Sequence, residues 1–306
     1  MAYFQLEKMP SCLALYQSGE LYLRIQRLHD MLKQCSLCPR RCGVDRTAGE
    51  IGVCNAGATL KVSSAFPHFG EERPLVGRRG SGTIFFSHCN LRCSFCQNYD
   101  ISHHGAGDEV SPAQLSGMMM SLQNAGCLNI NFVTPTHFVP YIVAALPQAI
   151  QDGLKIPLVY NCSGYESLEV IELLDGIIDI YMPDAKFSSV EHATRFACAG
   201  DYFSVLKPVL KEMHRQVGSL KTTEHGDAYR GLLIRHLVMP NDTAGSREIL
   251  RFIATELGAD SYVNIMNQYR PCFHATADSL INRPITSWEY QSAIELAKEF
   301  GLNRGF

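Results

Sequence analysis

The residues of this sequence most able to do chemistry are three cysteines with a distinctive spacing. Cys89, Cys93 and Cys96 form a C-x3-C-x2-C pattern directly after residues 82–87, a run typical of a β-strand. Thiolates are the standard ligands of iron–sulfur clusters. A four-iron cluster held by three cysteines keeps one iron open to another ligand, the arrangement that separates catalytic from structural metal sites. The triad therefore predicts a catalytic 4Fe-4S cluster.

Two simpler interpretations of the triad are half of a zinc site and a group of small buried side chains. Zinc sites favour C-x2-C pairs. The next cysteine after the triad is Cys127, too distant in sequence to complete such a pair nearby. The spacing therefore favours the iron–sulfur interpretation.

A second group of cysteines precedes the triad with the spacing C-x2-C-x3-C-x11-C. Its members are Cys35, Cys38, Cys42 and Cys54. Glycines at positions 43, 49, 52 and 57 indicate tight loops around them. Four thiolates suit either a tetrahedral zinc or an auxiliary iron–sulfur cluster, and the sequence does not discriminate between the two. A closed site of this kind would be structural or would relay electrons.

The composition excludes several classes of protein. The 306 residues carry a formal net charge of −3 without a long charge run, which argues against a nucleic-acid partner. We expect no membrane span, because no apolar run of about 18 residues occurs. The first residues lack the basic start and apolar run of a signal peptide. Twelve cysteines in a chain without an export signal indicate metal binding in a reducing compartment, so we expect a cytoplasmic protein.

Strand-like and helix-like segments alternate from residue 82 onward. The predicted strands are 83–86, 129–133, 158–161, 177–182, 231–238 and 261–266. The predicted helices are 112–125, 140–151, 167–174, 190–211 with a break at Gly200, 246–257 and 287–300. Six βα repeats predict an α/β fold with a parallel sheet.

The chain divides into four predicted parts: a helical segment over 1–34, a Cys-rich metal-binding subdomain with a linker over 35–81, the α/β domain over 82–282, and a C-terminal helix packed on that domain over 283–306. Within the linker, His68 and Glu71 are compatible with a place near the active face or with a structural role.

Polar residues follow the predicted strands at the edge where such folds carry their active sites. Asp184 and Lys186 follow the fourth strand and point the same way if the strand continues, because side chains alternate along a strand. The alternative is a surface ion pair. Arg235 and His236 on the fifth strand point to opposite sides, so only one of them can face the site, and burial in the core is the more common fate of such a histidine.

The triad, with Phe95 before its last cysteine, resembles the radical S-adenosylmethionine (SAM) superfamily. The resemblance implies a partial TIM barrel of about six βα units. It also implies that SAM binds the open iron and is cleaved by one electron to methionine and a 5′-deoxyadenosyl radical. Thr134, Asn161, Asp184 and Lys186 are the SAM contacts it suggests. The Gly-Gly-Glu-Pro segment common in the superfamily is absent, and residues 134–136 stand in its place.

Further segments between residues 35 and 271 resemble a branch of that superfamily, the pyruvate formate-lyase activating enzyme-related (PflX-type) proteins. This branch implies a glycyl-radical enzyme as partner and a reductant such as flavodoxin or ferredoxin. Two alternatives stay open: a radical SAM enzyme that modifies a small molecule or peptide, and a non-catalytic iron–sulfur electron-transfer protein. Cys162 and Cys272 also follow strands, and we expect them to be ordinary buried cysteines.

Overall fold

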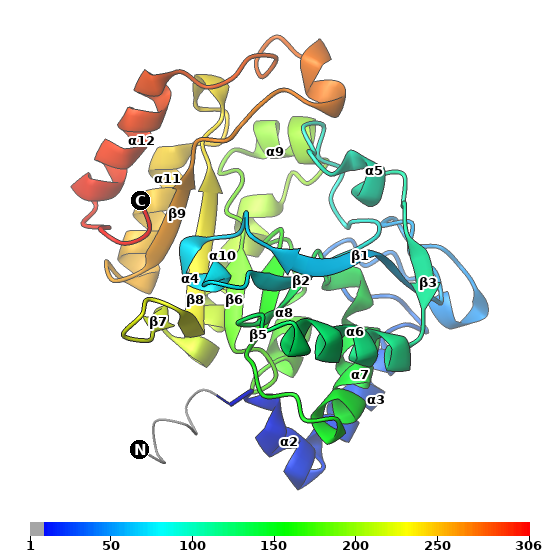
Figure 1. Cartoon of the computed structure of the whole chain (residues 1–306). Coiled ribbons are helices and arrows are strands. Elements are labelled where there is room, and N and C mark those ends of the chain that lie inside the picture. Colours follow the sequence, from blue (N-terminus) through cyan, green and yellow to red (C-terminus); the bar gives the residue numbers. More distant parts are fainter. Residues whose placement is uncertain (1–8) are drawn as a thin grey trace.

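A sheet of parallel strands forms the centre of the computed structural model, which describes residues 9–306 (Figure 1). Within the described chain, β2, β4, β5, β6, β8 and β9 run parallel in that order. Their bounds are Ser81–Phe86, Ile130–Val133, Leu158–Cys162, Ile180–Pro183, Ala228–Leu237 and Tyr262–Met266. Each overlaps one of the six predicted strands. β9 pairs with β8 and not with β2, so the sheet is an open barrel.

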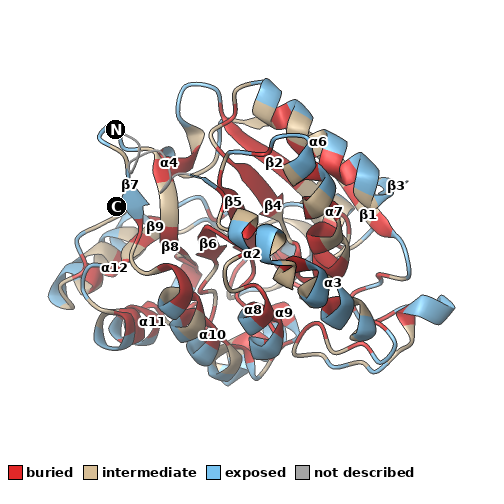
Figure 2. Cartoon of the chain, turned by 90° about the horizontal axis from the view of Figure 1, so that it is seen from below, coloured by how far each residue is buried: buried red, intermediate tan, exposed pale blue. Residues whose placement is uncertain are grey.

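Helices cover the outside of the sheet and turn their buried faces toward it (Figure 2). They are α6 (Pro112–Asn124), α7 (Val139–Gln151), α8 (Leu168–Leu173), α9 (Val190–Ala197), α10 (Tyr202–Val217), α11 (Ser246–Phe252) and α12 (Ser287–Glu299). The predicted break at Gly200 is confirmed, because α9 ends before it and α10 begins after it. At the start of α6, Ser111 and Gln114 form a capping box, which satisfies free backbone donors of the first turn.

The N-terminal helices pack beneath the barrel. α2 (Cys12–Ser18) and α3 (Glu20–Asp30) contact α7. Both lie within the segment over 1–34 that was predicted to be helical. Among the described residues, no helix is long and apolar enough to cross a membrane. The absence of a signal peptide was predicted from the first eight residues, which lie outside the described part.

The segment expected as a linker contains regular structure instead. β1 (Leu60–His68) pairs antiparallel with β2 on one side and with the short β3 (Asp108–Val110) on the other. It therefore extends the sheet beyond the first barrel strand (Figure 1). In the basic turn that precedes β2, residues 77–79 are exposed and Gly80 is buried.

A short helix, α4 (Arg73–Val76), follows β1 and plugs the barrel from inside. Its Leu75 is fully buried and packs against Val159, Ile180 and Leu233 on the inner faces of β5, β6 and β8. Burying one such leucine side chain contributes roughly 2 kcal/mol. Asn129 fixes the plug further, because its side-chain amide donates to the Leu75 carbonyl at 2.9 Å.

The C-terminal segment packs on the barrel's helical layer. α12 contacts α11, and Thr286 and Glu289 form a capping box at its start. Between α11 and β9 the chain makes one further wide helical turn over Ile253–Leu257. The remaining short elements are α5 (Tyr99–Ser102) after the triad and β7 (Lys221–Thr222), which pairs antiparallel with β8.

Candidate active site

The triad lies on an irregular loop over residues 87–98, directly after the carboxyl end of β2. Backbone hydrogen bonds hold both ends of this loop: the Ser87 N–H donates to the Lys61 carbonyl at 3.0 Å, and the Ser94 N–H donates to the Phe196 carbonyl at 2.9 Å. β1 and α9 therefore fix the loop from opposite sides.

All three triad cysteines line one cleft of about 440 Å³, called the cleft from here on. Every residue that the sequence suggested for SAM lines the same cleft. Those residues are Thr134, Asn161, Asp184 and Lys186. Phe85, Gln97 and Gln268 are among the other lining residues. Side chains from the loops after five different strands therefore meet at one place, as expected for the carboxyl face of such a barrel.

Burial is the main influence on the acidity of two triad thiols, Cys89 and Cys93. It raises the pKa of Cys89 to about 12, although the Leu91 N–H, 3.4 Å from the Cys89 sulfur, acts in the opposite direction. Burial also raises the pKa of Cys93. Metal ligation requires thiolates, so binding of iron must displace these protons.

The donor set fits an iron–sulfur cluster in its chemistry: three thiols on one loop, in a cleft with room for a further ligand. Among residues 9–306, no three Cys, His, Asp or Glu side chains converge closely enough to hold a single metal ion as they stand. A cluster of four irons spreads its ligands more widely than one ion does. The triad therefore suits the larger group better than a lone zinc.

Thr134 has a strained backbone beside the triad. It follows β4 with φ +58°, in the left-handed region that β-branched residues rarely adopt. Its N–H donates to the Asn161 carbonyl at 2.8 Å, which ties the end of β4 to the end of β5. Strain of this kind costs on the order of 1–3 kcal/mol and clusters at functional sites.

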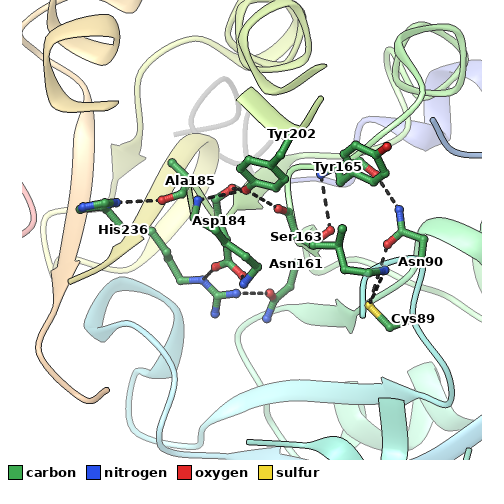
Figure 3. Close-up of polar contacts among 12 residues, drawn as sticks. Cys89, Asn90, Asn161, Ser163, Tyr165, Asp184, Ala185, Tyr202 and His236 are labelled. Atoms are coloured by element: carbon green, nitrogen blue, oxygen red, sulfur yellow. Dashed lines mark hydrogen bonds and ion pairs between the residues drawn. The ribbon is translucent and has the colours of Figure 1, made fainter. Parts of the chain in front are cut away.

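A network of charges crosses the inner face of the barrel (Figure 3). Asp184 accepts from Arg235 Nε at 2.7 Å and from Lys186 Nζ at 2.5 Å. Arg235 also donates through a second nitrogen to Asn161 Oδ1 at 2.7 Å. Asn161, Asp184 and Arg235 each lie two residues beyond an inward-facing side chain of their strand or strand end, so strand alternation brings them together.

The charges of this network stabilise one another. Burial alone would raise the pKa of Asp184, but Arg235 and Lys186 outweigh it, so the pKa lies below its usual value. Burial alone would lower the pKa of Lys186, but Asp184 holds it above the usual value. All three side chains are less than one fifth exposed. The network therefore stays ionised at neutral pH.

Of Arg235 and His236, it is Arg235 that faces the cleft. His236 is fully buried on the other face of β8, where its ring nitrogens lie 2.8 Å from the Ala185 carbonyl and 2.9 Å from Ser246 Oγ (Figure 3). Burial lowers its pKa, which keeps the ring neutral. His236 is therefore a buried core histidine with a partner for each ring nitrogen, the fate that the sequence analysis gave as the more common one.

The turn after β5 supports the network. Gly164 has φ +75°, and a Cβ there would lie 2.4 Å from the Asp184 carbonyl oxygen, so only glycine fits without displacement. The Tyr202 hydroxyl lies 2.7 Å from the carbonyl oxygens of both Ser163 and Asp184, and it accepts from the Lys186 N–H at 3.0 Å. The loops after β5 and β6 are thereby locked together.

The sequence model of the radical SAM superfamily matches residues 83–253, more than half of the chain. The chain belongs to the radical SAM superfamily. The matched region covers β2 to α11 and includes the triad and the charge network. Membership implies a 4Fe-4S cluster and SAM as cofactors, and it supports radical chemistry through SAM cleavage.

Other proteins resemble this radical SAM chain over most of its length. An uncharacterized protein from Methanocaldococcus jannaschii, MJ0674, is 33% identical over an alignment of 293 residues. The match covers 92% of this chain and 80% of that protein. The FeFe-hydrogenase maturase HydG from Carboxydothermus hydrogenoformans has a similar structure with a TM-score of 0.51 at 13% identity. The match covers 72% of this chain and 51% of HydG, so this chain spans about half of that protein. A second HydG structure has a TM-score of 0.47, with 12% identity, 72% of this chain and 49% of that chain covered.

The four N-terminal cysteines gather in one knuckle beside the radical SAM core. Gly52 lies between two of them, because a Cβ there would be 3.1 Å from the Cys42 sulfur and 3.7 Å from the Cys54 sulfur. Burial raises the pKa of Cys35, Cys38 and Cys54, that of Cys38 to about 12. The cysteines of the knuckle also interact electrostatically with one another, although here too no three of the described side chains converge closely enough to hold one metal ion as they stand.

Direct contacts join this knuckle to the triad loop. Arg40 Nε donates to the Asn90 carbonyl at 3.0 Å, and Arg92 donates in return to the Val53 carbonyl at 2.7 Å. The Arg40 guanidinium also lies 5.1 Å from the centre of the Tyr165 ring. The two cysteine groups are therefore held by the same set of loops.

Glu166 is a buried carboxylate behind the cleft that the sequence analysis did not single out. It is almost fully buried, with its carboxylate accepting from Thr136 Oγ1 at 2.8 Å and from the Tyr160 hydroxyl at 2.9 Å. Burial raises its pKa to about 7, although these hydrogen bonds act in the opposite direction. No local signal in the sequence marks it as buried, because its partners Thr136 and Tyr160 lie on other segments.

Cys162 and Cys272 differ in their surroundings. Cys162 is buried, as expected, and lines the cleft. Cys272 is only partly buried, which corrects the expectation of a core cysteine, because the chain leaves the sheet at Met266 and runs along the surface. Of the polar residues that follow β9, Gln268 and Tyr269 line the cleft.

Proposed function

We propose that this radical SAM enzyme abstracts a hydrogen atom from its substrate, with Cys89, Cys93 and Cys96 as the ligands of its 4Fe-4S cluster. The observation that carries the proposal is a single cleft that joins three thiols to an ionised Lys186–Asp184–Arg235 network. An electron carrier without a bound substrate has no need of such a network.

The residues of the cleft divide the recognition of SAM among them. Lys186 and Arg235 offer cations for its carboxylate, and Asp184 keeps both in place. Asn161 and the backbone at Thr134 offer polar groups for its hydroxyls and its ammonium. When bound and reduced, the cluster supplies the electron that cleaves SAM. The plug and the strand walls keep water away from the reacting atoms.

The N-terminal knuckle is proposed to hold zinc or an auxiliary iron–sulfur cluster. Four buried or half-buried thiols in one knuckle support a metal, and the contacts to the triad loop support a role in positioning the triad or in relaying electrons to it. The proposed domain limits, 35–81 for this subdomain and linker and 82–282 for the barrel, follow from the same division.

The partner is proposed from the resemblance to the PflX-type branch. It favours a glycyl-radical enzyme as the substrate and flavodoxin or ferredoxin as the electron donor, in the cytoplasm. A small molecule or a peptide is the second candidate substrate, and the cleft volume of about 440 Å³ is the observation that favours it. A glycyl-radical signal on a candidate partner after incubation with SAM and reductant would decide for the first.

The test of the main proposal is anaerobic reconstitution followed by electron paramagnetic resonance of the reduced cluster, with and without SAM, and an assay for 5′-deoxyadenosine. We expect a signal that shifts with SAM, product formation, and loss of both in Cys93→Ala. Cys127→Ala is the matched control, because Cys127 is a buried cysteine outside both groups. A reduced cluster whose signal does not change with SAM would favour the electron-transfer alternative.

The test of the knuckle is a metal count on the same preparations. We expect Cys38→Ala to lose one zinc, or one cluster's iron and sulfide, while iron at the triad stays. Equal metal contents in Cys38→Ala and wild type would rule out the knuckle as a metal site.

A further inference from the structure

The floor of the cleft carries two carboxylates that the recognition of SAM leaves unused. Glu71 and Glu72 stand directly before the plug helix α4 and line the cleft. They precede residue 83, where the match to the superfamily begins. They therefore lie outside the region that the superfamily model matches.

Both carboxylates are held in place although each side chain is only 7% exposed. Leu75 anchors the plug among the inner strand residues, and the Asn129 amide fixes its backbone. The Glu71 carboxylate accepts one contact, from His68 Nδ1 at 3.1 Å. Burial raises the pKa of Glu71, so a nearby cation would stabilise its ionised form.

Glu72 has an oxygen without a partner. Its Oε1 accepts from the Asn264 amide at 3.1 Å and lies 3.9 Å from Arg235. Its Oε2 is buried and makes no hydrogen bond. Within the described residues no donor fills this gap: Arg235 donates through two nitrogens to Asp184 and Asn161, and its third nitrogen lies 3.9 Å from the other Glu72 oxygen. A buried carboxylate oxygen normally has a hydrogen-bond donor, so a donor from a bound molecule is the missing partner.

The charges around the cleft are also unequal. Asp184, Glu71 and Glu72 are three carboxylates, whereas Lys186 and Arg235 are two permanent cations. The two cations stand together at the strand ends after β6 and β8. Glu71 and Glu72 therefore leave the cleft with an excess of negative charge, beside Arg235, for whatever shares the cleft with SAM.

We infer that Glu71 and Glu72 bind a cationic group of the substrate, an ammonium or a guanidinium. This inference rests on the proposed function, because it assumes that SAM occupies the side of the cleft with Lys186 and Arg235. The cation is the side chain of a lysine or arginine in a peptide, or the end of a small amine or guanidine. Charge-assisted hydrogen bonds to two carboxylates would fix it at a defined distance from the triad.

The experiment measures binding of matched probes to the reconstituted, SAM-loaded protein by calorimetry. Butylguanidinium is compared with the neutral butylurea, and butylammonium with butan-1-ol. A peptide arm compares acetyl-Gly-Arg-Gly-amide with its citrulline counterpart. We expect the charged member of a pair to bind at least about 10-fold more tightly, and Glu72→Gln and Glu71→Gln each to reduce that preference at least about 5-fold. Preference in the peptide pair alone assigns a peptide, and preference in a small-molecule pair assigns a small substrate.

Controls separate this inference from the proposed function. Glu109→Gln, an exposed carboxylate on β3, is expected to keep the full preference. Thermal unfolding shows whether the Gln variants are folded, and a wild-type protein without preference in any pair overturns the inference by itself. Equal losses of SAM affinity and of probe affinity in Glu72→Gln would assign the carboxylates to SAM and overturn it too. Failure of the proposed function is seen separately, as a cluster signal that SAM does not shift.

Discussion

Two aspartates on either side of one strand, Asp179 and Asp184, have opposite environments. Asp179 stands immediately before β6, at the amino end of the barrel, and Asp184 immediately after it, at the face with the cleft. The side chain of Asp184 is 13% exposed, and residue Asp179 is 2% exposed. Burial opposes the charge of both, but their pKa values move in opposite directions.

The carboxylate of Asp179 accepts hydrogen bonds mainly from uncharged donors. It accepts from the Ser11 hydroxyl at 2.6 Å, from the Ser11 N–H at 2.9 Å and from the Leu158 N–H at 2.8 Å. Burial raises its pKa to about 6, because these donors and the more distant Arg230 offset only part of the cost of burying the charge. It joins the N-terminal segment to the barrel and faces no cavity.

Asp184 has two cations in direct contact, so its charge is stabilised even though it is buried. The comparison shows how one residue type serves two purposes. Neutral donors suffice where a carboxylate only holds the chain together. Cations are required where the charge itself must persist beside a ligand site.

The largest effect is expected from Asp184→Ala. It leaves Lys186 and Arg235 without their shared anion, so both are free to move from the position that meets SAM. We expect formation of 5′-deoxyadenosine to fall about 1000-fold, equivalent to about 4 kcal/mol. Exposed Asp260, which pairs with Arg304, provides the control Asp260→Ala, expected to match wild type. A small effect of Asp184→Ala would contradict the role of Asp184 in positioning Lys186 and Arg235.

The second prediction tests the structural role of Asp179. Asp179→Ala leaves the Ser11 and Leu158 donors buried without an acceptor, and we expect the free energy of unfolding to fall by about 3 kcal/mol. Anaerobic chemical denaturation measures it. The affinity for SAM in the folded protein should stay unchanged, because Asp179 lies at the opposite end of the strand. A selective loss of SAM affinity in Asp179→Ala would contradict the purely structural role given to Asp179.

The third prediction concerns pH. The pKa of Asp179 is raised from 3.8 to about 6, so the folded state binds the proton more tightly than the unfolded state. Its contribution to stability is greatest below pH 4 and is lost as the pH rises to about 6, a change of roughly 2–3 kcal/mol. Asp184 has a lowered pKa, so its contribution is present above pH 4 and is lost as the pH falls. Asp179→Asn should therefore flatten the stability profile between pH 4 and 6, and an unchanged slope would count against the raised pKa.

Much of the fold was predictable because its signals are local. Alternation of strand and helix patterns predicts the parallel sheet, and the spacing of Cys89, Cys93 and Cys96 lies within one loop. The same holds for Asp184 and Lys186, which are two residues apart and point into the same cleft.

The remainder depends on contacts between distant segments. Whether Arg235 or His236 faces the cleft is decided by the register of β8 against its neighbours, which alternation alone leaves open. Residues 60–68 were assigned to a linker, but pairing with β2 and β3 makes them a strand. Glu71 and Glu72 reach the cleft only because the plug folds back into the barrel.

The smallest effect is expected from Ser11→Ala, at the contact that links Asp179 to a residue 168 positions away. It removes the hydroxyl that donates to Asp179 and accepts from Arg230 at 2.8 Å, but keeps the Ser11 N–H. We expect a loss of about 1 kcal/mol in the free energy of unfolding.

Ser11→Ala also sharpens the comparison of the two aspartates. The hydroxyl lowers the pKa of Asp179 against the effect of burial, so its removal should move the pH-dependent loss of stability above pH 6. Ser18→Ala is the control, because the Ser18 hydroxyl is exposed and contacts only its neighbours, the Leu15 carbonyl and the Glu20 N–H. A midpoint that stays in place would mean that the backbone donors alone set the pKa of Asp179, and the hydroxyl would then serve Arg230.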